Sequence, residues 1–135
     1  MRSPSGGRHT LVDRDAGAVA RAFAREGATV FLAGRTPAKL DAVANQVAST
    51  GRVAQTAQVD GLDEEAVERH AEAVAEQAGS LDVSFNAVGL NDGEQGIPLV
   101  ELPADDYLAP ITGYARTHFL TAKAAARHMM RQGRG

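Results

Sequence analysis

Three short β-prone runs in this sequence each end in residues that could contact an anionic ligand. The runs are 28–33 (ATVFLA), 52–59 (RVAQTAQV) and 81–85 (LDVSF). They are followed by Gly34, Arg35 and Thr36, by Asp60 and Gly61, and by Asn86, Ala87 and Gly89. An arginine guanidinium forms paired hydrogen bonds with a phosphate. Carboxylate and carboxamide oxygens accept hydrogen bonds, and a glycine lets the backbone come close to a ligand.

Helical segments separate these runs. Residues 16–25 (AGAVARAFAR) are rich in alanine and apolar on one face. Thr36 and Pro37 start a second helix that Gly51 ends, and Asp63 opens a third that Gly79 ends. Residues 104–131 are largely helical, with an interruption expected near residues 110–113. Strands that alternate with helices of this length form a parallel sheet, and ligands bind at the carboxyl ends of its strands.

We therefore predict an α/β fold, namely an incomplete, Rossmann-like, doubly wound parallel sheet of about three to four strands with flanking helices. The chain has 135 residues and a formal charge of −3, which fits one small domain without a general attraction to nucleic acid or anionic membrane. It has no cysteine, so thiolate metal sites and disulfides are excluded, and its four histidines lack the spacing of metal ligands. Residues 1–10 contain no apolar signal region, so we expect a cytoplasmic protein.

Several segments together resemble the short-chain dehydrogenase/reductase family. They are residues 18–43 (AVARAFAREGATVFLAGRTPAKLDAV), 81–89 (LDVSFNAVG) and 119–129 (FLTAKAAARHM), in the order and spacing of that family. The resemblance runs from about Gly17 to Met130. It implies an irregular N-terminal segment (1–15) followed by a partial NAD(P)-binding Rossmann domain (16–135). It also implies a dinucleotide cofactor and a small-molecule substrate that the sequence does not identify.

The resemblance assigns roles to the residues after each run. Gly34, Arg35 and Thr36 would lie at the adenosine ribose, where an arginine in place of an acid favours NADP over NAD. The alternatives are a solvated arginine at a strand end and a threonine that only caps a helix.

Asp60 would accept a hydrogen bond from the adenine amino group, and Gly61 would offer its backbone N–H to the ring. Alternatively, Asp60 only starts the turn before the next helix. Asn86, Ala87 and Gly89 correspond to the family's NNAG turn, which braces the sheet and passes beside the cofactor ribose. A plain loop turn is the alternative.

Two parts of the family pattern are missing. The glycines of its TGxxxGIG turn would fall on Thr10, Arg14 and Ala16, and none of these is glycine. Neither Tyr107 nor Tyr114 is followed by lysine four residues later, so the family's Tyr-x-x-x-Lys motif is absent, as is the serine that precedes it.

No catalytic residue is therefore assigned. We expect an NADP-preferring oxidoreductase chain that is truncated before its catalytic residues and inactive alone. The alternative is a non-catalytic nucleotide-binding or dimerisation module. In either case the resemblance implies a homo-oligomer formed through the helix around Phe119 to Met130.

Overall fold

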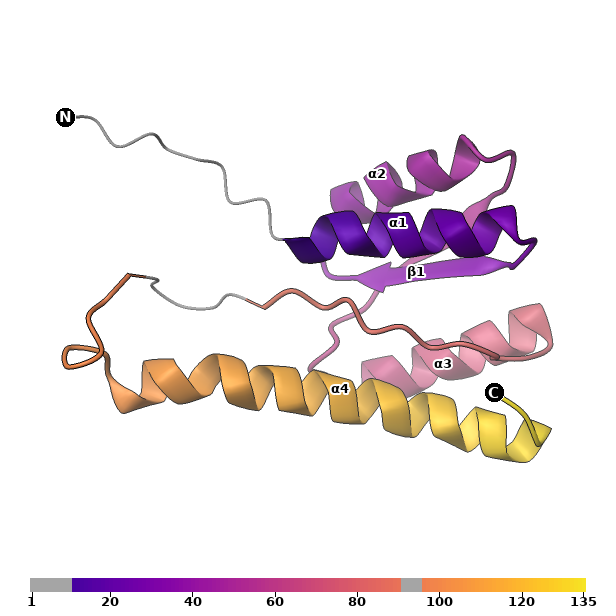
Figure 1. Cartoon of the computed structure of the whole chain (residues 1–135). Coiled ribbons are helices and arrows are strands. Elements are labelled where there is room, and N and C mark those ends of the chain that lie inside the picture. The colour runs from indigo at the N-terminus through magenta and orange to yellow at the C-terminus, as the bar shows by residue number, and fades with distance from the viewer. Residues whose placement is uncertain (1–10, 91–95) are drawn as a thin grey trace.

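Helices and strands alternate along the chain up to residue 78, and a long helix follows (Figure 1). The structure is a computed structural model that describes residues 11–90 and 96–135. The elements in these ranges are α1 (Leu11–Arg25), β1 (Val30–Gly34), α2 (Pro37–Ala48), β2 (Ala54–Gln58), α3 (Glu64–Ala78) and α4 (Ala104–Gln132).

The starts of α2 and α3 follow from local sequence, and both are confirmed. Thr36 is the N-cap of α2, and Pro37 takes its first position, where the missing N–H has no intrahelical partner to lose. At α3 the Asp63 carboxylate accepts a hydrogen bond from the Ala66 N–H at 3.1 Å. Gly79 ends α3 with a φ of 78°, a conformation that favours glycine.

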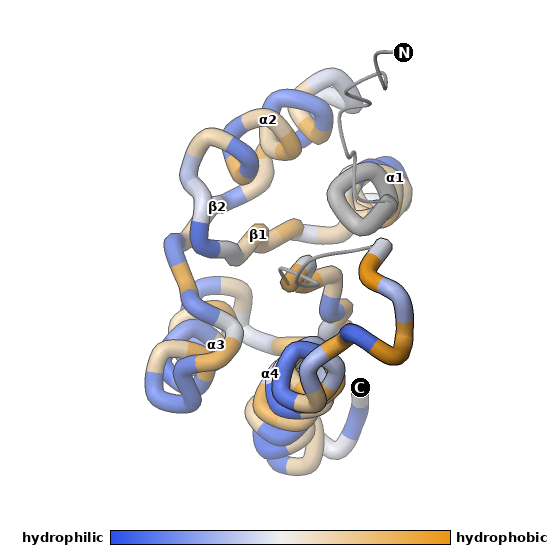
Figure 2. The backbone as a smooth tube through the Cα atoms, turned by 90° about the vertical axis from the view of Figure 1, so that its left-hand side faces the viewer, coloured by the Kyte–Doolittle hydropathy of each residue, from blue (hydrophilic) through white to orange (hydrophobic). Residues whose placement is uncertain are grey.

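The two strands are parallel, with Val30 opposite Ala54 and Gly34 opposite Gln58, and α2 connects them. Helices α1 and α2 cover one face of the sheet, and α3 and α4 lie on the other side, so the fold has three layers (Figure 2). The first core contains Ala20, Ala24 and Val47 packed against β1 and β2. The second core contains Val67, Ala71, Leu81, Leu120, Ala124 and Ala125.

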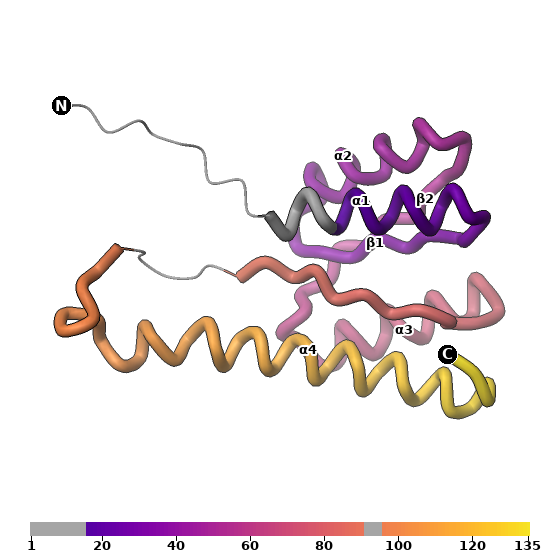
Figure 3. Tube along the Cα trace, in the orientation of Figure 1, coloured from indigo at the N-terminus to yellow at the C-terminus, as the bar shows by residue number. Residues whose placement is uncertain are grey.

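The strand predicted at residues 81–85 is not formed. This segment runs beside the sheet in the direction of β1 (Figures 1 and 3), but the described residues contain only a two-stranded sheet. Leu81 is buried, whereas Val83 and Phe85 are 59% and 57% exposed. In doubly wound sheets the first strand lies between the second and the fourth. A strand at 81–85 would be the fourth in this order, so its expected neighbour is the first strand and not β1. The first strand would precede α1 in the chain, and those residues are outside the described part.

Two element boundaries also differ from the prediction. Helix α1 begins at Leu11, so it covers the last five residues of the segment expected to be irregular (1–15). Helix α4 runs through Pro110 without the expected interruption. Proline has a helical φ, and the unfavourable loss of its N–H and the crowding of the preceding turn are offset where a helix has a packed face. None of the described helices is long and apolar enough to cross a membrane.

Candidate functional site

The carboxyl ends of β1 and β2 bring two of the predicted ligand-binding segments together. The Val59 N–H donates to the Gly34 carbonyl at 2.9 Å, which extends the strand pairing by one residue. The Gln58 side-chain amide donates to the Arg35 carbonyl at 3.2 Å. Residues 34–36 and 59–61 are therefore neighbours along one rim of the sheet.

Arg35 is exposed on this rim, and its guanidinium forms no hydrogen bond or ion pair within the described part of the chain. Thr36 occupies the N-cap of α2, as one of its two interpretations required, yet its hydroxyl makes no capping hydrogen bond. The first turn of α2 contains no acidic residue, whereas α3 and α4 each have two. The positive end of the α2 dipole is thus not compensated by a carboxylate, which suits an anion.

Asp60 takes the turn role that was one of its two interpretations. Its Oδ1 accepts from the Leu62 N–H at 3.0 Å, and its carbonyl accepts from the Asp63 N–H at 3.1 Å. The side chain is exposed, so a hydrogen bond from a bound base to the second carboxylate oxygen is sterically open. The turn and ligand roles are therefore compatible.

The carboxamide of Asn86 is used within the protein. Its Nδ2 donates to the hydroxyls of Thr117 at 3.3 Å and Thr121 at 2.9 Å. Its Oδ1 accepts from the Val88 N–H at 3.0 Å. Asn86 therefore braces the turn that contains Ala87 and Gly89 against α4.

Helix α4 supplies partners that the sequence did not single out. Thr117 is fully buried, and the Arg116 guanidinium donates to the Leu62 carbonyl at 3.0 Å. The Tyr114 hydroxyl accepts from the Leu90 N–H at 3.3 Å. One stretch of α4 thus contacts both the turn after β2 and the turn at 86–89. The available signal was the pair Thr117 and Thr121, one helical turn apart in an alanine-rich helix.

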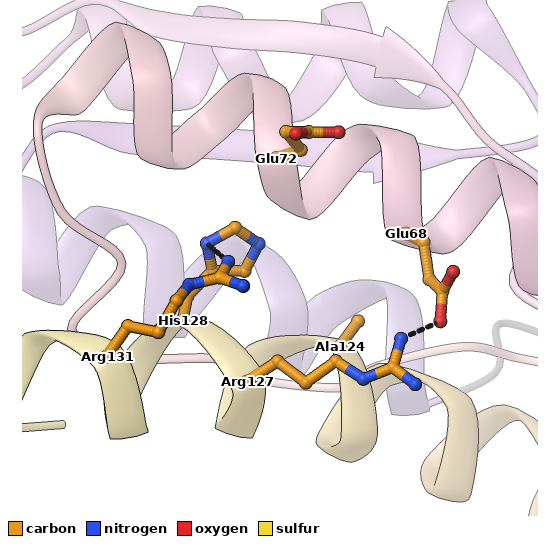
Figure 4. A pocket seen from close by; sticks show the side chains of 6 residues that line it. All are labelled: Glu68, Glu72, Ala124, Arg127, His128 and Arg131. Atoms are coloured by element: carbon orange, nitrogen blue, oxygen red, sulfur yellow. Dashed lines mark hydrogen bonds and ion pairs between the residues drawn. The ribbon is translucent and has the colours of Figure 1, made fainter.

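A polar hollow of about 160 Å³, open to solvent, lies elsewhere, between α3 and α4 (Figure 4). Its lining residues are Glu68, Glu72, Ala124, Arg127, His128 and Arg131. Glu68 pairs with Arg127, and Arg131 lies 3.0 Å from the His128 ring nitrogen. The hollow is on the part of α4 beyond Thr121, away from the rim. The described residues contain no cluster of three His, Asp or Glu side chains that could hold a metal.

Two titratable groups on α3 have shifted pKa values. A hydrogen bond from Lys123, with Nζ 2.5 Å from Glu64 Oε1, and the charge of Lys123 lower the pKa of Glu64. Burial lowers the pKa of His70 because a half-buried ring resists taking a charge. Neither group lies on the rim, so these shifts concern the packing of α3 and its stability.

Comparison with known proteins decides the family. A family model described as enoyl-(acyl carrier protein) reductase matches residues 16–135. The chain belongs to the short-chain dehydrogenase/reductase family. It is 32% identical over 117 residues to gluconate 5-dehydrogenase of Gluconobacter oxydans (strain 621H), a match that covers 87% of this chain and 44% of that protein. This short-chain dehydrogenase/reductase chain thus spans less than half the length of that curated relative.

Solved structures from the family show the same arrangement. A metagenomic short-chain oxidoreductase in complex with NADP superposes with a TM-score of 0.77 at 29% identity, covering 92% of this chain and 56% of that one. An NAD⁺-bound xylitol dehydrogenase gives a TM-score of 0.75 at 28% identity, covering 91% and 46%. The predicted fold class is thereby confirmed. One of these relatives thus holds NADP and the other NAD⁺.

Proposed function

We propose that this chain binds the adenosine half of NADP in preference to that of NAD. The observation that carries the proposal is the exposed Arg35 at the carboxyl end of β1, whose side chain has no partner in the described part of the chain and lies next to a helix start without acidic residues. Arg35 would pair with the 2′-phosphate, and the unused Thr36 hydroxyl would donate to the same group. Gly34 would let the backbone come close to the ribose.

The other predicted residues complete this site. Asp60 accepts a hydrogen bond from the adenine amino group through its second carboxylate oxygen, and the Gly61 backbone contacts the ring. The turn held by Asn86 presents Ala87 and Gly89 to the ribose on the nicotinamide side. The contacts of both turns with α4 support this part of the proposal, since they hold the two turns over the same stretch of one helix.

These 135 residues are proposed to bind the cofactor as part of an oxidoreductase but not to transfer hydride by themselves. The sequence has no Tyr-x-x-x-Lys motif to exchange a proton with a small-molecule substrate. The cytoplasmic location expected from the sequence stays a prediction.

The test is a titration of purified protein with NADPH and with NADH, followed by fluorescence or calorimetry, alongside an assay for NADPH oxidation with a panel of ketones and aldehydes. Tighter binding of NADPH without turnover supports the proposal. Equal affinity for both dinucleotides refutes the NADP preference, and loss of all binding refutes the site.

A specific observation also favours dimerisation as a second function of the chain. Helix α4 carries an exposed apolar stripe with residues three or four apart: Leu108, Ile111, Ala115, Phe119, Ala122, Ala126 and Met130. Phe119 and Met130 are 64% and 82% exposed, which is unusual for side chains of their size. The alanines between them would let a second helix approach closely.

We propose a second copy of this chain as the partner of this stripe. Asp105 and Asp106 lie at the start of α4, and Arg131 and Arg134 lie at or beyond its last turn. Two antiparallel copies of α4 would therefore place acidic residues against basic ones at both ends, with Phe119 near the centre.

Sedimentation equilibrium tests this arrangement. Phe119→Asp should convert a dimer into a monomer, because it buries a charge at the centre of the interface. Val53→Asp is the matched control, since Val53 is 82% exposed and lies before β2, away from α4. A monomeric wild-type protein, or equal effects of the two substitutions, would refute the proposed dimer.

A further inference from the structure

We infer that Thr117 is a positioning residue that sets the spacing between the turn after β2 and the turn at residues 86–89. The inference rests on the proposed function, since these turns are where adenine and the nicotinamide-side ribose are proposed to bind. Thr117 is not itself proposed to touch the cofactor. It acts through Gly61 on one side and through Asn86 on the other.

Burial shows that the Thr117 side chain is held in one place. Its exposure is 0%, and it is the one buried polar side chain among the described residues. Its hydroxyl accepts a hydrogen bond from Asn86 Nδ2 at 3.3 Å. A buried hydroxyl without a partner is unfavourable, so this bond fixes the distance between α4 and the 86–89 turn.

Gly61 contacts the same hydroxyl from the other side. A Cβ atom placed on Gly61 would lie 2.8 Å from Thr117 Oγ1 and 3.2 Å from Val88 Cγ2. The first distance is shorter than any ordinary contact between these atom types. Gly61 is therefore glycine because its backbone is packed directly against Thr117 and the Asn86 turn, and not because of its φ angle, which is not positive.

Two neighbours of Thr117 on α4, Thr121 and Arg116, each hydrogen-bond to one of the two turns. Thr121 accepts a hydrogen bond from Asn86 at 2.9 Å and itself donates to the Thr117 carbonyl at 2.9 Å. The Arg116 guanidinium donates to the Leu62 carbonyl, in the turn after β2. Thr117 is thus the side chain at which both turns meet, which makes a distinct prediction for its replacement.

Backbone amide exchange in the ligand-free protein gives the first test. The Leu62 amide is bonded to Asp60 and reports on the turn after β2, and the Val88 amide is bonded to Asn86 and reports on the second turn. Thr117→Val, which keeps the shape and removes the hydroxyl, should accelerate exchange of both amides. Thr117→Ser should restore slow exchange. Thr121→Val is the matched control and should accelerate exchange of Val88 alone.

Binding of ADP, which carries the adenine and lacks the nicotinamide, gives the second test. Thr117→Val should weaken ADP binding about 5- to 10-fold, the effect of one buried hydrogen bond, and Thr117→Ser should stay within about 2-fold of wild type. Gly61→Ala should weaken it about 10-fold by steric displacement. Thr117→Ala removes the oxygen with which the methyl group introduced by Gly61→Ala would collide. The double variant Gly61→Ala/Thr117→Ala should therefore lose less ADP affinity than the product of the two single losses.

The outcomes separate this inference from the proposed function. If wild type binds no ADP but Thr117→Val still accelerates exchange in both turns, the nucleotide proposal fails and the positioning role stands. The positioning role is refuted if Thr117→Val leaves the exchange rate of the Leu62 amide unchanged. It is also refuted if the losses of ADP affinity caused by Gly61→Ala and Thr117→Ala simply multiply in the double variant. Should Thr117→Val not fold, Thr117→Ala removes the same hydroxyl, and acceleration of both the Leu62 and the Val88 amides is then the result expected.

Discussion

Replacing Arg35 with alanine should weaken the binding of NADPH and leave the binding of NADH nearly unchanged. Arg35 is exposed and its side chain has no hydrogen-bond or ion-pair partner among the described residues, so its removal breaks no such bond within residues 11–90 and 96–135. Any change in affinity therefore reports on the ligand and not on the fold. This separation makes Arg35 the most informative position on the rim.

The size of the effect follows from the exposure of the guanidinium. A hydrogen bond to a charged group contributes about 1.5–3 kcal/mol, and exposure to solvent favours the lower half of that range. A loss of about 1.5–2 kcal/mol corresponds to a roughly 10- to 30-fold weaker affinity for NADPH. The loss should shrink as salt is added, because exposed charges are screened within about 10 Å at 0.1 M ionic strength.

The assay is fluorescence titration of NADPH and NADH at low and high ionic strength. Arg52→Ala is the matched control, since Arg52 is also exposed but precedes β2, at the opposite end of the strands. Arg35→Asp extends the test, because an acid at this place accepts hydrogen bonds from an unphosphorylated 2′-hydroxyl and should favour NADH. Equal losses for both dinucleotides, or an equal effect of Arg52→Ala, would refute the assignment of Arg35 to the 2′-phosphate.

Three further predictions concern stability, measured as the free energy of unfolding in urea. Burial lowers the pKa of His70 from 6.5, so the unfolded chain binds the proton more readily than the folded protein does. Stability should therefore fall as the pH drops below about 6.5, and His70→Gln should flatten this dependence on pH. Lys123 lowers the pKa of Glu64 from 4.5, so the stability that this pair contributes should be present above that pH and be lost as the pH falls through the folded-state pKa. Glu64→Gln should remove this loss of stability at acid pH. Val47 is fully buried between α2 and the sheet, so Val47→Ala should lower the free energy of unfolding by about 2 kcal/mol. An unchanged urea midpoint would contradict this and show that the core can collapse around the gap.

Sequence patterns with a local cause predicted the corresponding elements well. Thr36 with Pro37 predicted the start of α2, and Asp63 predicted that of α3, because a cap acts on the backbone groups next to it. The neighbouring positions of Arg35 and Asp60 also followed from sequence, since the carboxyl ends of parallel strands meet at one edge. The segment 104–131 was expected to break near Pro110, but packing of the face with Leu120 and Ala124 against α3 favours a continuous helix.

The features that sequence did not reveal depend on residues far apart in the chain. Thr117 looks like an ordinary threonine in a helix until Gly61 and Asn86 are brought to it from two separate turns. Its role comes from the meeting of three segments, which no periodicity within one of them reports. The same holds for the side chain of Asn86, whose type suggested a ligand contact but whose amide is used by Thr117, Thr121 and Val88.

The segment 81–85 shows why a β-prone run does not by itself form a strand. Its composition is that of a buried strand, yet a strand exists only where a neighbour accepts and donates its backbone hydrogen bonds. Within the described residues no backbone bond joins it to β1, and Val83 and Phe85 stay more than half exposed. The amides of Val83 and Phe85 should therefore exchange with solvent much faster than the Val59 amide, which is bonded to the Gly34 carbonyl at 2.9 Å. Comparable protection at all three amides would mean that residues 81–85 find a strand partner in solution, and that the sheet is wider than two strands.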